Sequence, residues 1–91
     1  MSESPSSRLS RMTMRSWRRG MKEMDLILGP FADANLAVMS PEAMAQYDRL
    51  LGENDQDLYS WVAGASAPPP ELAPLIRQIA DFAFAGQRSG S

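Results

Sequence analysis

Apolar residues in the first half of the chain recur at intervals of three and four, the spacing of a helix with one buried face. In the clearer of two such segments the residues are Met21, Met24, Ile27, Leu28 and Phe31. In the sparser segment before it they are Leu9, Met12 and Trp17, set among arginines. The pattern predicts one helix over about 9–19 and a second over about 21–28 or a little beyond, which Pro30 is expected to bend or end.

In the second half the same spacing returns between turn signals. Ser40-Pro41-Glu42 predicts a helix start, because Ser caps, Pro suits the first helical position and an acid suits the positive first turn. We expect Gly52 to close this third helix. The cluster at 54–57 can cap a short fourth helix, which Gly64 is expected to end.

The last helix is expected to begin between residues 70 and 74, with Pro74 in its first turn, where a missing N–H is harmless. The apolar residues expected to face the core in the three later helices are Met44, Tyr47, Leu51, Leu58, Trp61, Val62, Leu72, Leu75, Ile76, Ile79 and Phe82. At helical spacing, Met24 and Phe31 are also expected in the core, and Trp61 is expected to anchor the bundle.

Five short amphipathic helices with brief connections predict an all-α fold, a compact five-helix bundle with flexible termini. Residues 1–7 lack apolar spacing and residues 86–91 are polar, so both are predicted to be flexible tails around a domain at 8–85. A chain of 91 residues has room for one domain. Because so small a domain buries only about 60–65 % of its unfolded surface, its function should lie on an outer face.

The composition argues against catalysis. The chain contains no Cys and no His, which removes thiolate chemistry, the commonest general base and the commonest metal ligand. Its acids form no recognisable ligand series, so no metal site is expected. No apolar run approaches the roughly 20 residues that cross a bilayer, so no membrane insertion is expected. We therefore expect a protein that is not an enzyme and that docks onto a larger partner.

The charges divide the chain into a basic end and an acidic body. Six of the nine basic residues lie at or before Lys22, and ten of the eleven acids follow it. A basic helix can bind nucleic acid through phosphates, but an acidic body repels the same polyanion, so no nucleic acid is expected. Two alternatives stay open: a nucleic-acid-binding adaptor that uses the basic helix, and a helical adaptor or antitoxin-like protein that binds an unrelated protein.

The segment Arg18-Arg19-Gly20-Met21-Lys22-Glu23 admits two interpretations. In the structural one, Gly20 is a left-handed residue that ends the first helix, the arginines favour that helix's negative end, and Glu23 favours the positive start of the next. In the functional one, cations, a glycine and an acid share an exposed corner that contacts a partner.

Arg19, Gly20 and Glu23 form an Arg-Gly-x-x-Glu motif, which is followed by Asp25, Phe31, Leu50-Leu51, Asp55, Asp57-Leu58 and Trp61. In this order, after a basic helix, they resemble the SdhE family of succinate dehydrogenase assembly factors, over about residues 11–79. The resemblance implies a small helical bundle that binds the flavoprotein subunit of succinate dehydrogenase or fumarate reductase. It further implies that the bundle promotes covalent attachment of FAD to a His of that partner.

By this resemblance, Arg19, Gly20 and Glu23 correspond to a partner-contact motif, and Arg11 and Asp25 to flanking positions of the same surface. Arg19 and Glu23 are expected to form charge-assisted hydrogen bonds with the partner, while Gly20 permits a close approach. The arginine-rich stretch around Trp17 departs from the family pattern. FAD is implied only as the group attached to the partner, and no cofactor is expected to be held stably by this chain.

Two further expectations concern state and location. We expect a monomer when the protein is free. We also expect a cytoplasmic location, on the inner face of a bacterial membrane rather than in a mitochondrial matrix, because no long removable presequence precedes the predicted domain.

Overall fold

Helices account for most of residues 4–89, which are the residues that the computed structural model describes. The helices are α1 (Pro5–Trp17), α2 (Lys22–Asn35), the short 3-10 helix η1 (Leu36–Val38), α3 (Pro41–Leu50), α4 (Asp55–Ala63) and α5 (Ala73–Ser89). No strand occurs within this part of the chain. The all-α prediction with five helices is therefore confirmed.

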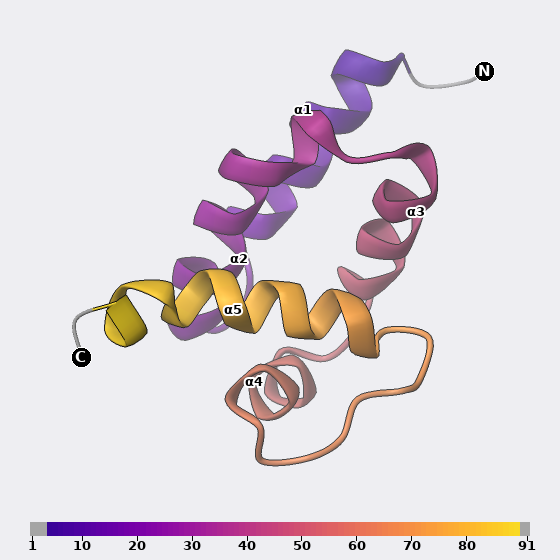
Figure 1. Cartoon of the computed structure of the whole chain (residues 1–91). Helices are drawn as coiled ribbons and strands as arrows, with labels where there is room; N and C mark the ends of the chain where they lie inside the picture. Colours follow the sequence, from indigo (N-terminus) through magenta and orange to yellow (C-terminus); the bar gives the residue numbers. More distant parts are fainter. Residues whose placement is uncertain (1–3, 90–91) are drawn as a thin grey trace.

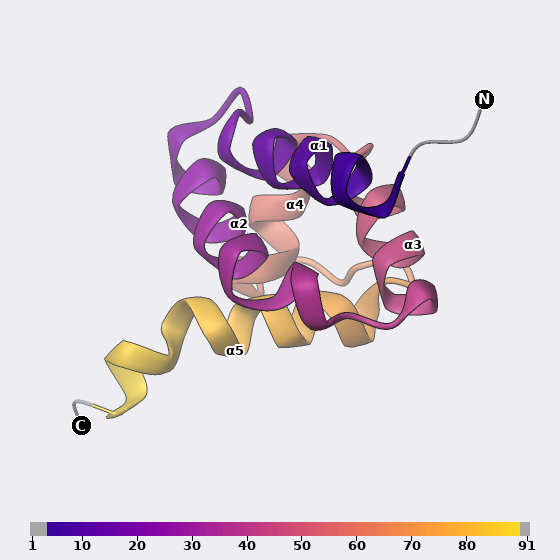
Figure 2. The same cartoon turned by 90° about the horizontal axis from the view of Figure 1, so that it is seen from above.

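The helices form a bundle in which α1 and α5 lie on opposite sides. Figure 2 shows α2, α3 and α4 between them, and in both views the C-terminal end of α5 projects past the other helices. The chain turns sharply between α1 and α2, and that turn lies beside the loop from α3 to α4, as the hydrogen bonds described below show.

Apolar side chains from every helix form one core. Its buried members are Met12, Met24, Leu28, Phe31, Ala32, Leu36, Tyr47, Leu50, Leu51, Leu58, Val62, Leu72, Leu75, Ile76 and Ile79. Met24 and Phe31 are thus core residues as predicted, and Trp61 packs partly buried against the core. The Phe31 ring lies 5.8 Å from the ring centre of Tyr47 and 5.7 Å from that of Phe82. Phe82 remains partly exposed, because it covers the edge of this aromatic group.

A buried hydroxyl pair joins α1 to α3. The Ser16 hydroxyl donates to the carbonyl of Met12 at 2.8 Å and lies 2.6 Å from the Tyr47 hydroxyl. Burial raises the pKa of Tyr47 to about 12. The tyrosine therefore stays neutral over the usual pH range and holds the C-terminal end of α1 against α3.

Both ends of the bundle are more helical than the sequence analysis predicted. α1 begins at Pro5, because the Ser4 side chain accepts a hydrogen bond from the Ser7 backbone N–H at 3.2 Å. The helix therefore includes residues 5–7 of the segment predicted as an N-terminal tail, and residues 1–3 lie outside the described chain. α5 continues to Ser89, so it includes residues 86–89 of the predicted C-terminal tail, and residues 90–91 are not described. The flexibility of the two tails and the domain bounds 8–85 stay predictions.

α2 runs five residues past Pro30, to Asn35. The helix is thus longer than the expected range of about 21–28 or a little beyond, and Pro30 does not end it. A proline inside a helix costs about 3 kcal/mol, but the turns after Pro30 bury Phe31, Ala32 and Leu36. Burying one large apolar side chain contributes about 1.5–3 kcal/mol, so the buried residues outweigh the lost hydrogen bond.

The predicted helix starts and stops in the second half are mostly confirmed. The Ser40 side chain accepts from the Ala43 N–H at 3.1 Å, and the Asn54 side chain accepts from the Gln56 N–H at 2.8 Å. Gly64 ends α4 in the left-handed conformation, and Pro74 is the second residue of α5. α3 differs slightly, since it ends at Leu50, with Leu51 as its C-cap.

Candidate functional site

The corner, defined as residues 19–21, connects α1 and its C-cap residue Arg18 to α2. The chain leaves α1 at Arg18, with φ −125° and ψ 52°, and enters α2 after Met21, which is extended. Within the described residues, positive φ occurs only at Gly64. The interpretation that Gly20 is left-handed and thereby ends α1 is therefore wrong.

Arg19 fastens the corner to the loop between α3 and α4. Its Nε donates to Asp55 Oδ1 at 2.6 Å, its Nη1 to the Leu51 carbonyl at 2.7 Å and its Nη2 to the Glu53 carbonyl at 2.8 Å. Carbonyls at the C-terminal end of a helix lack helical partners and carry partial negative charge, which a guanidinium satisfies. Only 10 % of the Arg19 side chain is exposed. It therefore supports the corner from inside.

Two carboxylates hold the backbone of the corner. Oδ2 of Asp55 accepts the Gly20 N–H at 2.8 Å, while the other oxygen binds Arg19. Oδ1 of Asp25 accepts the Arg19 N–H at 2.5 Å. Asp55 lies in the first turn of α4 and Asp25 in the first turn of α2. Side chains from two helices therefore fix the position of consecutive peptide groups.

The outer side of the corner is open. Gly20 is exposed, as are Arg18, Lys22 and Glu23. Within the described chain these three charged side chains have no hydrogen bond or ion pair. A Cβ placed on Gly20 would meet Asp55 Oδ2 at 3.4 Å, which is an ordinary contact. The corner thus exposes a position without a side chain, next to charged side chains that have no partner among the residues that the structure describes. Hydrogen bonds hold its backbone in place.

The structure brings some of the predicted site residues together and separates others. Arg19, Gly20 and Asp25 are joined by hydrogen bonds, and Glu23 lies in the adjoining first turn of α2. Arg11 lies further back on α1, with its Nη2 3.8 Å from Asp48 Oδ2. The contact of these five residues with a partner stays a prediction. For Arg19, the internal bonds leave little of the guanidinium for that contact.

Asp55 is the corner residue whose role the sequence analysis missed. Its position directly after the Asn54 cap made it look like a residue of the helix start only. Its actual partners, Arg19 and Gly20, lie 36 and 35 residues earlier in the chain. An acid at such a position could have been matched to the Arg-Gly pair, because that pair offers two adjacent donors.

The exit from α1 is also fixed by a close helix contact. The Trp17 ring lies directly over Gly29 of α2, where a Cβ would overlap the ring atoms. Its Nε1 donates to the Asp33 carboxylate, at 3.2 and 3.3 Å from the two oxygens. This packing brings the end of α1 close to α2 and so determines where the corner lies.

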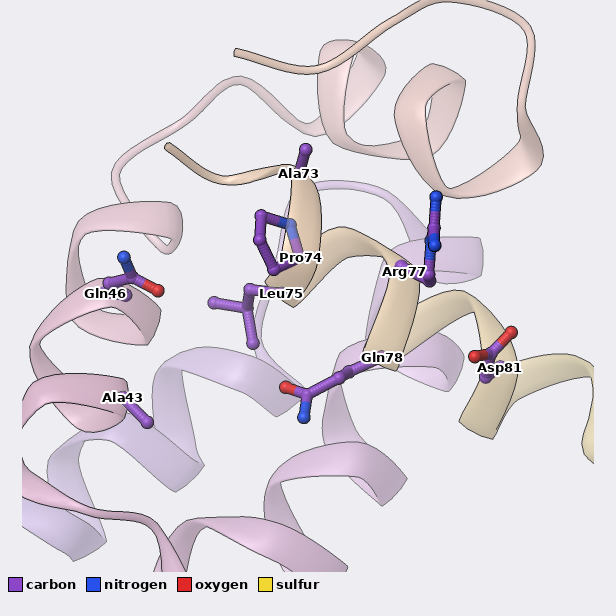
Figure 3. Close-up of a pocket in the computed structure, with 8 residues that line it drawn as sticks. All are labelled: Ala43, Gln46, Ala73, Pro74, Leu75, Arg77, Gln78 and Asp81. Carbon is purple, nitrogen blue, oxygen red and sulfur yellow. The ribbon is translucent and has the colours of Figure 1, made fainter. Parts of the chain in front are cut away.

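Elsewhere the surface has a shallow depression of about 460 Å³ between α3 and α5, shown in Figure 3. Gln78 extends from α5 toward α3, and Arg77 and Asp81 point away from α3. The lining combines amide and apolar groups without a pair suited to acid–base chemistry. In the described part of the chain, no group of three His, Cys, Asp or Glu side chains could hold a metal ion, and no helix is long and apolar enough to cross a membrane.

The chain matches the family model described as the flavinator of succinate dehydrogenase over residues 10–83. It is 34 % identical over 87 residues to succinate dehydrogenase assembly factor 2, mitochondrial, of Candida glabrata, covering 90 % of this chain and 57 % of the relative. It is 39 % identical over 75 residues to assembly factor 2-A, mitochondrial, of Drosophila yakuba, covering 80 % and 46 %. The match to the Aspergillus flavus factor is 44 % over 61 residues, covering 67 % and 20 %. The chain thus spans only part of the length of these relatives.

Proposed function

The chain belongs to the family of flavinators of succinate dehydrogenase, and on that premise we propose that it binds the flavoprotein subunit of succinate dehydrogenase or fumarate reductase. Bound there, it promotes covalent attachment of FAD to that subunit. The names of its relatives, succinate dehydrogenase assembly factor 2, support this role.

The observation that carries the proposal is the corner. Residues 19–21 lie inside the matched range 10–83 and are held by Arg19, Asp25 and Asp55, so a partner would meet a preformed surface. A preformed surface loses little conformational freedom on binding, which favours affinity. The exposed Lys22 and Glu23, at the start of α2, offer charge-assisted hydrogen bonds close to Gly20, which has no side chain.

The proposed mechanism is positioning. Docking selects the arrangement of the flavoprotein in which the flavin and the residue it modifies are at reacting distance. Positioning of reacting groups can lower a barrier by several kcal/mol, up to about 7–11 kcal/mol in well-oriented cases. The chain supplies no catalytic residue in this scheme, and the bond forms within the partner. FAD is held by the partner, and this chain acts as a monomer without a stable cofactor of its own.

For the compartment, we propose the cytoplasm, with the mitochondrial matrix as the alternative that the names of the relatives suggest. The absence of Cys fits a reducing compartment, which is common to both. Fractionation of the host cells followed by immunoblotting would distinguish them, and recovery with mitochondria would contradict the proposal.

The proposed function is tested by producing the flavoprotein with and without this chain and measuring protein-bound flavin fluorescence in denaturing gels. We expect the wild-type chain to raise the amount of covalent FAD. Glu23→Ala should weaken docking, by about 2–5 kcal/mol if the contact excludes water. Equal covalent FAD with and without the wild-type chain would contradict the proposed function.

Glu42→Ala is the matched control. Glu42, like Glu23, is an exposed acid in the first turn of a helix, but it lies on α3. Both substitutions remove the same favourable interaction with a helix N-terminus. A difference between the two variants in covalent FAD therefore reports the position of Glu23 at the corner.

A further inference from the structure

Four arginines form a row on one face of α1. Arg8, Arg11, Arg15 and Arg18 are spaced by three, four and three residues, which places them on the same side of a helix. The first three surround one carboxylate of α3, with nitrogen–oxygen distances to Asp48 of 4.0, 3.8 and 3.1 Å. Arg18 continues the row to the corner. Among the described residues, four arginines and one carboxylate, Asp48, lie on this face, so it is positive.

An exposed apolar side chain lies within the row. Met14 is 54 % exposed, and it lines a shallow depression of about 270 Å³ with Arg11, Arg15, Arg18 and Arg19. An apolar centre with a polar rim is the usual composition of a protein contact surface. Because Arg19 belongs both to this lining and to the corner, the depression is continuous with the surface proposed above.

We propose that this α1 face, defined as Arg11, Met14, Arg15 and Arg18, is a second part of the docking surface and receives an acidic segment of the client flavoprotein. Carboxylates of that segment lie against the arginines, and an apolar side chain lies against Met14. The inference rests on the proposed function, since it assigns the charge of the client surface that the chain recognises.

The charges favour a protein over a nucleic acid. Asp48 lies among three of the arginines and repels a row of phosphates, and the rest of the molecule is acidic. For an acidic protein segment the same carboxylate is helpful, because it holds the guanidinium groups in place and so lowers the ordering cost of binding. The exposed Met14 side chain is best covered by an apolar group, which a phosphate backbone does not offer.

The positive charge of the α1 face should act mainly on the rate of association with the client flavoprotein. Opposite charges on the two surfaces steer the encounter, and their effect weakens as salt screens it. The corner then fixes the bound orientation. Binding to the client is therefore expected to have two separable parts, a salt-dependent one along α1 and a less salt-dependent one at the corner.

The test uses the full-length chain and the isolated flavoprotein, with affinity measured at about 50 and about 300 mM salt. Arg18→Glu should weaken binding about tenfold or more at low salt and less at high salt. Met14→Asp should weaken binding as well, since it puts a charge at the apolar centre. Both side chains are exposed, so the variants should fold, which thermal unfolding checks.

Arg77→Glu is the matched control. It makes the same change of charge on an exposed residue of α5, on the side of the bundle opposite α1 (Figure 2). Its affinity should stay within about twofold of the wild type, because α5 lies on the side of the bundle opposite the proposed surface and salt screens charges that act from there.

The outcomes separate the two proposals. Wild-type affinity for Arg18→Glu and Met14→Asp, together with weaker binding of Glu23→Ala, would overturn the inference and leave the proposed function standing. No binding of the wild-type chain to the flavoprotein would overturn both. If Arg18→Glu weakened binding to a single-stranded oligonucleotide and not to the flavoprotein, the α1 face would be a polyanion site and the inference would be wrong.

Discussion

Gly20, between α1 and α2, and Gly64, after α4, are both exposed glycines in turns, but their backbone conformations differ. Gly64 has φ 83°, and the N–H groups of Gly64 and Ala65 return to carbonyls of the last turn of α4, at 3.2 Å to Trp61 and 2.8 Å to Ser60. This is a helix stop that requires a left-handed residue. The corner has no such requirement, because Gly20 lacks a positive φ.

The two glycines therefore need different explanations. At Gly64 the backbone conformation alone explains the glycine, since a side chain there would have open space but would strain the backbone. At Gly20 side chains of Arg19, Asp25 and Asp55 fix the turn, and φ is not positive. The fold therefore shows no left-handed conformation that would require glycine here, which agrees with the proposal that a partner approaches the corner closely.

The largest effect is expected on stability, from removing a side chain that fixes the corner. Arg19→Ala would leave Asp55 partly buried without its cation and two carbonyls without their donor, at a cost of about 3 kcal/mol. Urea unfolding measures it. Arg49→Ala is the control, because its ion pair with Glu71 is exposed (62 % and 48 %) and should contribute less than about 1 kcal/mol. Equal losses in the two variants would mean that the corner is not held by Arg19.

Gly20→Arg is expected to have the largest effect on binding. The added side chain has room to point outward, so the free energy of unfolding should change by less than about 0.5 kcal/mol, as for ordinary surface substitutions. Docking should weaken about a hundredfold, or about 2.7 kcal/mol, because the partner can no longer approach the corner closely. Affinity for the flavoprotein and covalent FAD are the readouts.

Ala67→Arg, in the exposed loop before α5, adds similar bulk and charge away from the corner and should bind normally. If Gly20→Arg bound and promoted flavinylation as well as Ala67→Arg, the opening at Gly20 would have no part in docking. The difference between Gly20 and Gly64 would then say nothing about docking.

The features that could be predicted from sequence are those that depend on neighbouring residues. Ser40 and Asn54 cap their helices through N–H groups two or three positions away, so the local pattern sufficed. Ser4-Pro5 has the same Ser-Pro start as Ser40-Pro41, yet the first helix was predicted to begin only at about residue 9, because residues 5–8 show no apolar spacing. The Ser-Pro start signal is present, but the first turn shows no apolar face that would indicate a helix.

The features that could not be predicted depend on residues far apart in sequence. The bond from Arg19 to Asp55 spans 36 positions, and the one from Ser16 to Tyr47 spans 31. No periodicity encodes such pairs, because they follow from how the helices pack. For the same reason the sequence indicated which residues form the corner and did not show that Arg19 faces inward while Glu23 faces out.

Gly64→Ala should cost about 1 kcal/mol of stability, because a non-glycine residue in the left-handed region loses about that much. Docking should not change, since the α4 stop is held by backbone hydrogen bonds and is no part of the proposed surface. Thermal unfolding and affinity for the flavoprotein, measured on the same preparation, give both values. Weaker docking in this variant would extend the contact surface to α4 and contradict the separation of the two turns.

Gly20→Ala is the smallest change and the one that sharpens the comparison most. Its single methyl would meet Asp55 Oδ2 at 3.4 Å, an ordinary contact, and the backbone needs no adjustment. Stability should stay within about 0.5 kcal/mol of the wild type or rise slightly, because Ala restricts the unfolded chain more than Gly does. Urea unfolding beside Gly64→Ala makes the contrast direct, because the same substitution should be neutral at one turn and destabilising at the other. A loss at Gly20 equal to that at Gly64 would show that the corner needs glycine for its own folding, and the argument for an outside partner at this position would fail.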